Sequence, residues 1–554
     1  MAIDRQSQSF QQDELRPLPP QAHLQPMRGW KLWVTIFALF LGLLLSTLET
    51  TIVSTALITI ASDLGGYDKS NWIIVAYLLT YTGFLIVYSR CSDIFGRKSS
   101  FITALAIFTA FSIACGVSRT MEQLIIFRAF QGIGGAGIYS MVMAVMAEVT
   151  PVESIGPVTG LMSTIFALSS ILGPVLGGAI TTNASWRWVF YLNIPGGGLA
   201  LAIVIWFFPR NDGRLPINRL SFNRIDWPGI LLSLIGSVFL LLALEEGGSA
   251  FSWDGSLIVV SFIVTGAAWI AFIAWEIYVA MVYSRRTSSF ASKMMPVFPV
   301  WLIRRRIVCA SLIAAFLAGF PFMVLIVYLP ERFEIQDGLS PVASGIRMLP
   351  LLLLSALGAG AGGVINSRKN ISFYTLMVGL SLQLIGLGCM TTLPTTGTII
   401  DAQYGYQVLL GLGFGTTLTS LVVISRLEVD APDLAITMGA VTQVRVLGGT
   451  IGISIGQVLI THFVDRDLSD VLSTDEMAAL KASVSSSRNF PASKQNAVSE
   501  VYGRAFNAQI KVVLYITAAC WVLGLGTFKK NPVNFRDAGR IEPCGSGDQE
   551  QDQG

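Results

Sequence analysis

The chain has 554 residues, of which 53% are hydrophobic and only 13% are charged, and its formal net charge is +3. Soluble domains carry roughly a quarter charged residues, so this composition excludes an ordinary soluble protein. A net charge this small offers no basic surface for nucleic acid, and we expect none as a partner. The six cysteines show no metal-ligand spacing, so we also expect no disulfide framework and no metal site.

The apolar residues collect in fourteen blocks, each long enough for one transmembrane helix. About 20 apolar residues cross the hydrocarbon layer, and only a closed helix satisfies its own backbone hydrogen bonds there. We therefore predict an all-α protein embedded in the lipid bilayer. In chain order the predicted helices span residues 31–59, 71–90, 99–118, 122–146, 156–181, 189–208, 227–245, 256–280, 307–330, 342–364, 371–392, 404–425, 433–462 and 508–528.

The placement of lysine and arginine tests this number of helices, because these residues collect in cytosolic loops. The first 29 residues are polar and lack the apolar core of a cleaved signal, so we place them in the cytosol. Inner segments then hold 24 Lys and Arg residues, and the short outer loops hold 4. One helix more or fewer would reverse this bias for every later loop, so we expect both termini in the cytosol.

Two similar loops indicate an internal repeat. The loops after the second and tenth predicted helices both place an acidic or amide residue a few positions before a basic pair. Such repeats are common in secondary transporters. We predict two six-helix bundles, two inserted helices between them, an external loop with a capping box at Ser473 and Glu476, and two cytosolic tails. The bundles cover residues 30–209 and 304–528, and the inserted helices lie within 210–303. The external loop covers 464–506, and the tails cover 1–29 and 529–554.

The loop between the second and third predicted helices contains Asp93, Gly96, Arg97 and Lys98. With this spacing it resembles G-x-L-x-D-x-x-G-R-K, the signature loop of the major facilitator superfamily, and Ser89 and Cys91 replace the first glycine and the leucine. An aspartate at a helix end can pair with an arginine and hold one conformation closed. We predict that these four residues form an inner gate. The alternative is a charged loop that only sets the topology.

The fourth predicted helix carries Arg128 and Gln131 in a segment similar to the family's R-x-x-Q-G-x-G-x-A element. A charge at the centre of a membrane helix costs about 2.5–3.5 kcal/mol, so such a residue is a functional candidate. The resemblance implies proton coupling for Arg128, and we place Gln131 in a central cavity. The alternative for Arg128 is a side chain that extends to the outer interface.

The fifth predicted helix contains the spacing of the antiporter motif, G-x8-G-x3-G-P-x2-G-G. Its residues here are Gly160, Gly173, Pro174, Gly177 and Gly178, with Ser169 at one glycine position. Glycines let helices approach closely, and proline bends a helix by removing a backbone hydrogen bond. The resemblance implies export as the direction of transport. The alternative is ordinary packing through small residues.

The first predicted helix ends in a segment that resembles the L-D-x-T-I-V-x-x-A-L element of the fourteen-helix drug:proton antiporter branch. Glu49 stands at the position of the aspartate, and Ile58 at that of the proline that usually follows. Burial disfavours the charged form of a carboxyl group, which makes Glu49 a candidate proton carrier. The alternative is a carboxylate that pairs structurally with an arginine.

Three further segments add candidates. Gln443 and Arg445 in the thirteenth helix resemble a later element of the same branch, and Arg445 either faces the cavity or ties helices together. The segment from Trp186 to Pro195 resembles the W-R-W-x-F-x-x-N-x-P element, and we interpret it mainly as an interfacial anchor. Asn183 opens an Asn-Ala-Ser sequon on the outer side and is a predicted glycosylation site.

Within this branch the chain is most similar to fungal exporters of toxins and secondary metabolites. The resemblance implies a central cavity that opens alternately to each side, with the proton gradient as energy source and no cofactor. We expect a monomer in the plasma membrane that exchanges protons for a small amphipathic organic molecule. The alternatives are the vacuolar membrane, uptake of a substrate such as iron-siderophore, and a sensor without transport.

Two glycine-rich strings match G-x-G-x-x-G, at 132–137 and 358–363, but both lie inside predicted membrane helices. They lack the strand and turn of a dinucleotide site. The sequence has no G-x4-G-K-[ST] string, and its two histidines, His23 and His462, form no catalytic set. We therefore expect neither an ATP-driven pump nor an enzyme.

Overall fold

A computed structural model gives the fold. It describes residues 27, 29–65, 69, 72–151, 154–208, 225–248, 251–284, 296–298, 300–339, 341–368, 370–395, 400–429, 433–473, 476–477, 480, 490–530 and 532. The predicted cytosolic tails, the basic parts of the 210–303 linker and part of the external loop lie outside these residues. Those predictions therefore remain predictions.

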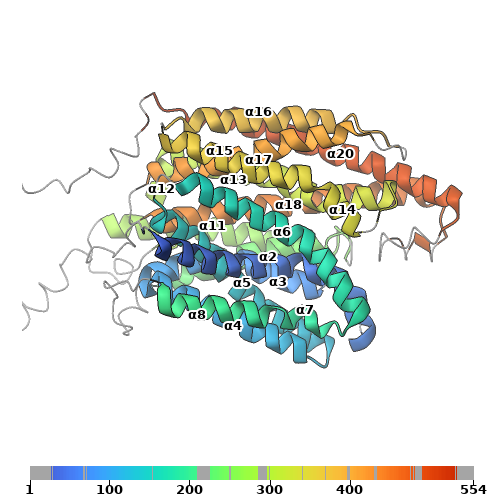
Figure 1. Cartoon of the computed structure of the whole chain (residues 1–554), viewed down its shortest axis with the longest axis horizontal. Coiled ribbons are helices and arrows are strands. Elements are labelled where there is room, and N and C mark those ends of the chain that lie inside the picture. The colour runs from blue at the N-terminus through green and yellow to red at the C-terminus, as the bar shows by residue number, and fades with distance from the viewer. Residues whose placement is uncertain are drawn as a thin grey trace, which may run out of the picture.

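The helices run side by side in two bundles, one blue to teal and the other yellow to red in Figure 1. The N-terminal bundle consists of α2 (Trp30–Leu64), α3 (Trp72–Phe95), α4 (Arg97–Val117), α5 (Met121–Val149), α6 (Ile155–Asn183), α7 (Arg187–Tyr191) and α8 (Asn193–Phe207). The C-terminal bundle consists of α13 (Arg306–Gln336), α14 (Pro341–Arg347), α15 (Leu349–Arg368), α16 (Ser372–Met390), α17 (Ala402–Leu427), α18 (Leu434–Leu468), α20 (Ala492–Gly524) and the short turn η6 (Leu525–Thr527). The all-α architecture is confirmed.

Each predicted span coincides with a helix or with a pair of shorter helices. Thirteen helices in the described part of the chain are long and apolar enough to cross a membrane. The remaining predicted span corresponds to α6, which has 29 residues and no charged side chain. The sixth and tenth predicted helices are each divided, into α7 and α8 and into α14 and α15.

The last predicted helix was placed too far along the chain, because α20 begins at Ala492 rather than at 508. The segment before 508 is amphipathic, and its polar face lowers its mean hydropathy. The mean therefore does not show that its apolar residues recur at helical intervals. Val498, Val501 and Ala505 nevertheless follow each other at helical intervals and are buried in the C-terminal core. The predicted capping box is present, since the Ser473 amide donates to Glu476 Oε2 at 2.8 Å and the Glu476 amide donates to Ser473 Oγ at 3.3 Å.

Two further membrane helices, α10 (Trp227–Glu246) and α11 (Ser256–Ser284), join the bundles together with the short helix α12 (Val300–Arg304). Helix α10 packs against α3 of the first bundle and α18 of the second, and α11 packs on α10. Asp226 caps α10 by accepting hydrogen bonds from the Gly229 amide (2.9 Å) and from Trp275 of α11 (2.7 Å). Burial raises the pKa of Asp226.

The two ends of the membrane domain lie on one face, which we call the terminal face and define by Trp30, Phe207, Glu428 and Lys529. The rings of Trp30 and Phe207 are 5.8 Å apart, and Lys529 forms a 2.8 Å ion pair with Glu428. Arg426, two residues before Glu428, donates to the Thr150 carbonyl oxygen at the end of α5 at 3.2 Å and so links the two bundles at this face. The first and last membrane helices therefore reach the same face, and the cytosolic placement of both termini stays a prediction.

Glycines permit the closest helix contacts. A Cβ on Gly134 of α5 would lie 2.5 Å from the backbone nitrogen of Phe108 in α4, and one on Gly358 of α15 would lie 2.6 Å from the Leu412 carbonyl oxygen in α17. These glycines belong to the two G-x-G-x-x-G strings. The strings therefore serve packing between helices, in agreement with the rejection of a dinucleotide site.

We predict that Gly415→Ala destabilises the protein, because the added Cβ would overlap the Ser355 carbonyl oxygen and the Ala359 amide of α15. Overpacking of this kind costs about 1–3 kcal/mol. The matched control is Gly388→Ala in the neighbouring helix α16, where the Cβ would meet nothing within 4 Å. Thermal unfolding of the purified protein in detergent should show a lower midpoint for Gly415→Ala only. Equal midpoints for the two variants would contradict the packing described here.

Candidate functional site

A buried ion pair lies inside the N-terminal bundle. Arg128 Nη1 of α5 lies 2.8 Å from Glu49 Oε1 of α2, and each side chain is only 1% exposed. The sequence singled out both residues separately, and the structure brings them together. Full burial excludes the alternative that Arg128 extends to the interface. Each charge has its counterion, which is the condition under which charges are tolerated in a medium of low dielectric constant.

Three further polar side chains complete the surroundings of this pair. Asn193 of α8 donates to Glu49 Oε2 at 2.6 Å and also to Ser112 Oγ of α4 at 2.8 Å. Gln131, one turn after Arg128, accepts from Arg128 Nη1 at 2.8 Å and donates to Ser112 Oγ at 3.2 Å. Gln131 therefore belongs to this buried network and is not among the residues that line the pocket described below.

Helix α3 closes the network on one side. The Ile73 carbonyl oxygen accepts from Arg128 Nε at 3.0 Å, and the Tyr77 ring lies under the guanidinium at 4.3 Å. Tyr77 in turn donates its hydroxyl to the Ser46 carbonyl oxygen at 3.1 Å. Ion pair, hydrogen bonds and cation–π contact thus connect α2, α3, α4, α5 and α8 at one point. Glu49 itself contacts Arg128 of α5 and Asn193 of α8, and these two partners link it to the other helices of the network.

Asn193, Ser112 and Tyr77 were not predicted as site residues. Asn193 lies in the W-R-W-x-F-x-x-N-x-P segment, which we interpreted as an interfacial anchor. That interpretation fits the start of the segment, because Trp186 and Arg187 donate to Asp63 Oδ2 at 2.8 and 3.0 Å. These hydrogen bonds lower the pKa of Asp63. The sequence feature that could have identified Asn193 is its position at the start of an apolar span, because a polar side chain there needs a hydrogen-bonding partner.

The predicted gate residues form a second cluster, close to the terminal face. Arg97, at the start of α4, binds Asp93 (2.7 Å) near the end of α3 and Glu148 (2.7 Å) at the end of α5. All three side chains are at most 6% exposed. Glu148 completes this cluster and was not predicted. Lys98 instead donates to the carbonyl oxygens of Ile205 and Phe208 at the end of α8, at 2.7 and 2.9 Å.

The turn before Arg97 requires glycine. Gly96 has φ +91°, a conformation that side chains other than glycine rarely adopt. This turn joins α3 to α4 and directs Arg97 toward Asp93 and Glu148. The glycine of the signature loop thus has a backbone role, and the two charged residues around it carry the electrostatic contacts.

Two glycines of the antiporter motif on α6 pack against helices of different bundles. A Cβ on Gly160 would lie 3.1 Å from the Ala356 carbonyl oxygen of α15, so this glycine packs α6 against the other bundle. A Cβ on Gly173 would overlap Thr51 of α2, within the same bundle. Ser169, the departure from the motif, forms a 2.6 Å hydrogen bond with Thr47 of α2. Helix α6 therefore packs closely against helices of both bundles. At Gly178, in contrast, an added Cβ would meet nothing within 4 Å.

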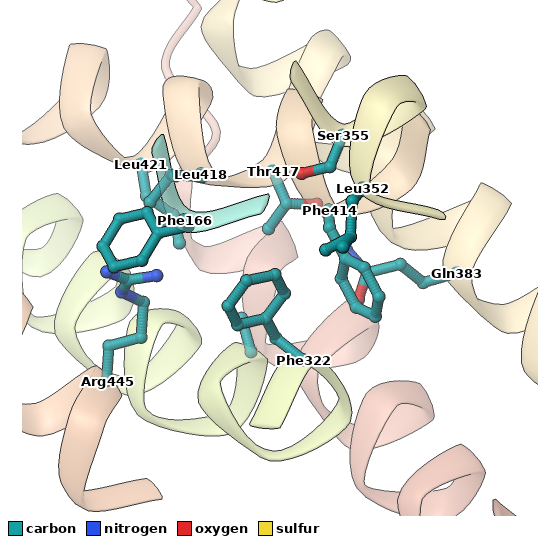
Figure 2. A pocket seen from close by; sticks show the side chains of 11 residues that line it. Phe166, Phe322, Leu352, Ser355, Gln383, Phe414, Thr417, Leu418, Leu421 and Arg445 are labelled. Carbon is teal, nitrogen blue, oxygen red and sulfur yellow. Dashed lines mark hydrogen bonds between the residues drawn. The ribbon is translucent and has the colours of Figure 1, made fainter. Parts of the chain in front are cut away.

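A partly open pocket lies between the bundles, with most of its wall in the C-terminal one (Figure 2). Phe166 of α6 lines it from the N-terminal bundle, and α13, α15, α16, α17 and α18 supply the rest. Arg445 lines this pocket and also donates to the Tyr139 hydroxyl of α5. Both alternatives for Arg445 therefore apply. Gln443 is buried and is not among the lining residues.

A stack of tyrosines connects the ion pair to the pocket. Tyr77 and Tyr81 are stacked with ring centroids 5.6 Å apart, and Tyr81 and Tyr139 are stacked at 6.2 Å. Tyr139 then contacts Phe166 of the pocket edge-on at 5.9 Å and accepts a hydrogen bond from Arg445. The chain of contacts from Arg128 to Arg445 is thus continuous and crosses from one bundle to the other.

The predicted glycosylation residue Asn183 ends α6. It is exposed, and its side-chain nitrogen donates to the Ala179 carbonyl oxygen at 2.9 Å. Its use as an acceptor remains a prediction.

Comparison with known proteins agrees with this architecture. Residues 39–453 match the family model of the Major Facilitator Superfamily. The chain is 42% identical over 500 residues to the MFS-type transporter FPY5 of Fusarium mangiferae, covering 89% of this chain and 82% of that protein. It is 31% identical to Multidrug resistance protein 3 of Bacillus subtilis, covering 79% and 81%, and 31% identical to the efflux pump FUS6 of Gibberella fujikuroi, covering 79% and 77%.

Solved structures share the fold. A bacterial homolog of the human lysosomal transporter Spinster, in an inward-facing conformation, matches with a TM-score of 0.55 at 14% identity, covering 92% of this chain and all of that one. The proton:xylose symporter XylE matches with a TM-score of 0.53 at 13% identity, covering 87% and 94%. At this level of identity the likeness concerns the arrangement of helices alone.

We predict that Arg128→Met destabilises the protein strongly, because it leaves the Glu49 carboxylate buried without its counterion. Loss of one partner of a buried pair costs about 3–5 kcal/mol. The double variant Glu49→Leu, Arg128→Met removes both charges and should recover most of that loss. The measurement is the thermal unfolding midpoint of the purified protein.

The matched control is Lys69→Met, which breaks the exposed 2.9 Å pair between Lys69 and Glu122. An exposed pair is worth at most about 1 kcal/mol, so its midpoint should barely move. The account of the buried pair is wrong if Arg128→Met lowers the midpoint no more than Lys69→Met does.

Proposed function

We propose that this chain, which belongs to the major facilitator superfamily, is a proton-coupled antiporter that exports small amphipathic organic molecules. The observation that carries the proposal is the buried Glu49–Arg128 pair, because it places one protonatable carboxylate in a network that connects five helices. As a member of this family the chain is a membrane transporter and not an enzyme. Proton coupling, direction and substrate are our inference.

Glu49 is the proposed proton carrier. In the structure its two oxygens accept from Arg128 and Asn193, so the carboxylate is the form that this arrangement satisfies. A proton on Glu49 removes the negative partner of Arg128. The guanidinium then keeps the Ile73 carbonyl oxygen, Gln131 and the Tyr77 ring as partners. We infer that α2 and α8 become free to move relative to α5 in the protonated state.

The Asp93, Arg97 and Glu148 cluster is the proposed inner gate, and the terminal face is the proposed cytosolic face. Its support is the contact between bundles at that face, where Arg426 of α17 donates to the Thr150 carbonyl oxygen at the end of α5. Ser89 of α3 also packs against Gly439 of α18, where a Cβ would overlap its hydroxyl. Breaking these contacts would open the pocket to the cytosol.

Export is supported by the antiporter motif on α6 and by relatives that bear the name efflux pump. The proton gradient supplies the energy. The membrane potential contributes about 2.3 kcal/mol per charge per 100 mV, and a pH gradient adds to it. We propose the plasma membrane as its location, with both termini in the cytosol, and a monomer as the transporting unit.

We predict that, in proteoliposomes with an acidic interior, the wild-type protein accumulates substrate inside, since antiport moves substrate against the proton flux. The sign of coupling does not depend on how the protein is oriented. Ethidium and radiolabelled 2-naphthoic acid serve as cationic and anionic probes, and protein-free liposomes correct for passive trapping. Accumulation only when the interior is alkaline would indicate symport and contradict the proposed export.

Glu49→Gln should abolish this gradient-driven accumulation, because an amide cannot carry the proton but keeps hydrogen-bonding capacity. Glu122→Gln is the matched control, since it neutralises an exposed carboxylate of the same bundle and should transport as the wild type does. Both variants should reconstitute in equal amounts. Proton-driven accumulation by Glu49→Gln at the wild-type rate would exclude Glu49 as the carrier.

A further inference from the structure

We propose that the pocket between the bundles binds its substrate as an organic anion, with the anionic group on Arg445 and a hydroxyl or N–H group on Gln383. The proposal rests on the proposed transport function and adds the chemical class of the substrate. It follows from the charge of Arg445, from an unpaired atom of Gln383 and from the competing partner Tyr139.

Arg445 brings a positive charge into a wall that has no negative one. The residues that line the pocket in the described part of the chain include no aspartate or glutamate. There the guanidinium donates to the Tyr139 hydroxyl, which is neutral. A buried or half-buried cation without a counterion is costly, so an anionic ligand gains more here than a neutral one does.

Gln383 presents a hydrogen-bond acceptor at the other end of the pocket. Its side chain is fully buried, and its Nε2 donates to the Gly413 carbonyl oxygen (3.1 Å) and to Thr417 Oγ1 (2.8 Å). These two acceptors fix the orientation of the amide. Its Oε1 then has no hydrogen-bond partner among the described residues. A buried carbonyl oxygen in this state gains by accepting a hydrogen bond from a ligand.

The wall between these two residues is apolar and rich in rings. Figure 2 shows Arg445 and Gln383 on opposite sides of the pocket, with Phe322 between them. Phe166 and Phe414 add two more rings to the wall. Flat apolar molecules pack well against such rings. The substrate class is therefore a flat organic acid, with its ionised group at one end and a donor at the other.

Tyr139 makes recognition of the anion a competition between two partners. A carboxylate adds an opposite charge and can accept two guanidinium N–H groups in parallel, whereas the hydroxyl offers one neutral oxygen, so a carboxylate displaces the hydroxyl from Arg445. Tyr139 lies on α5 and Arg445 on α18, so this displacement removes a contact between the bundles. The tyrosine stack extends from Tyr139 to Tyr77 under Arg128. Anion binding is thereby sensed at the proposed proton site.

The test is equilibrium binding to the purified full-length protein in detergent at pH 7.5, with three probes that share one ring system. These are 2-naphthoic acid, its neutral amide, and 6-hydroxy-2-naphthoic acid, whose hydroxyl lies at the end opposite the carboxylate. We expect the acid to bind at least tenfold more tightly than the amide. Arg445→Gln should remove this preference, Arg445→Lys should keep most of it, and Gln383→Leu should weaken only the hydroxylated acid.

Tyr139→Phe separates recognition from a merely structural tie. It removes the competing hydroxyl, so we expect the acid to bind severalfold more tightly and the amide to bind unchanged. If Tyr139→Phe instead weakens the acid as Arg445→Gln does, Arg445 and Tyr139 only hold the bundles together and the proposal fails. The proposal also fails if the wild type binds acid and amide equally or binds none of the three probes.

This assay contains no proton gradient, so it separates the substrate class from the proposed antiport. Acid preference without gradient-driven transport would contradict the antiport and leave the anion site standing. Transport of ethidium without acid preference would do the reverse. If Arg445→Gln fails to elute as a monodisperse peak, the acid-to-amide ratio of the wild type and the Tyr139→Phe result still decide the matter.

Discussion

The ion pair between Glu49 and Arg128 is the interaction on which the N-terminal bundle depends. A membrane-embedded bundle gains little from the hydrophobic effect between helices, because lipid tails are as apolar as the side chains they replace. Specific polar contacts therefore carry more of the specificity of packing. Here one carboxylate and one guanidinium form hydrogen bonds with residues of α3, α5 and α8, and Ser112 of α4 joins the network through Asn193 and Gln131. The same contacts that fix the helices make their arrangement sensitive to one proton.

Close contacts of three kinds join the two bundles. Near the terminal face the Arg97 cluster lies beside the contact of Arg426 with α5. Along α6, Gly160 brings the backbone close to α15. The tyrosine stack ends on Arg445 at the pocket. A transporter needs such contacts to be few and breakable, because the bundles must separate on each side in turn.

Much of the fold followed from the sequence, since a span of apolar residues has few alternatives in a membrane. Lysine and arginine placement also indicated that both ends share a face. The amphipathic start of α20 was missed, because only Val498, Val501 and similar positions are apolar there. Its burial depends on a core formed by distant helices, which hydropathy does not report.

The site was predicted residue by residue but not as an arrangement. Glu49 and Arg128 stood out as charges in apolar spans, yet they are 79 residues apart and nothing local indicated their pairing. Glu148 escaped notice because a carboxylate at a helix end resembles an ordinary interfacial charge. Tyr139 and Gln383 carry no sequence signal at all, because one tyrosine or glutamine in an apolar helix acquires a role only from its neighbours in space.

The most direct test of the central claim is the protonation state of Glu49 itself during the cycle. Infrared difference spectroscopy of the reconstituted protein, recorded between acidic and neutral buffer and again on adding 2-naphthoic acid, reports the carbonyl stretch of a protonated carboxyl group. The account predicts a protonated-carboxyl band at acidic pH that disappears when the substrate binds and is missing in Glu49→Gln. An identical band in Glu49→Gln, or none in the wild type under any condition, would contradict it.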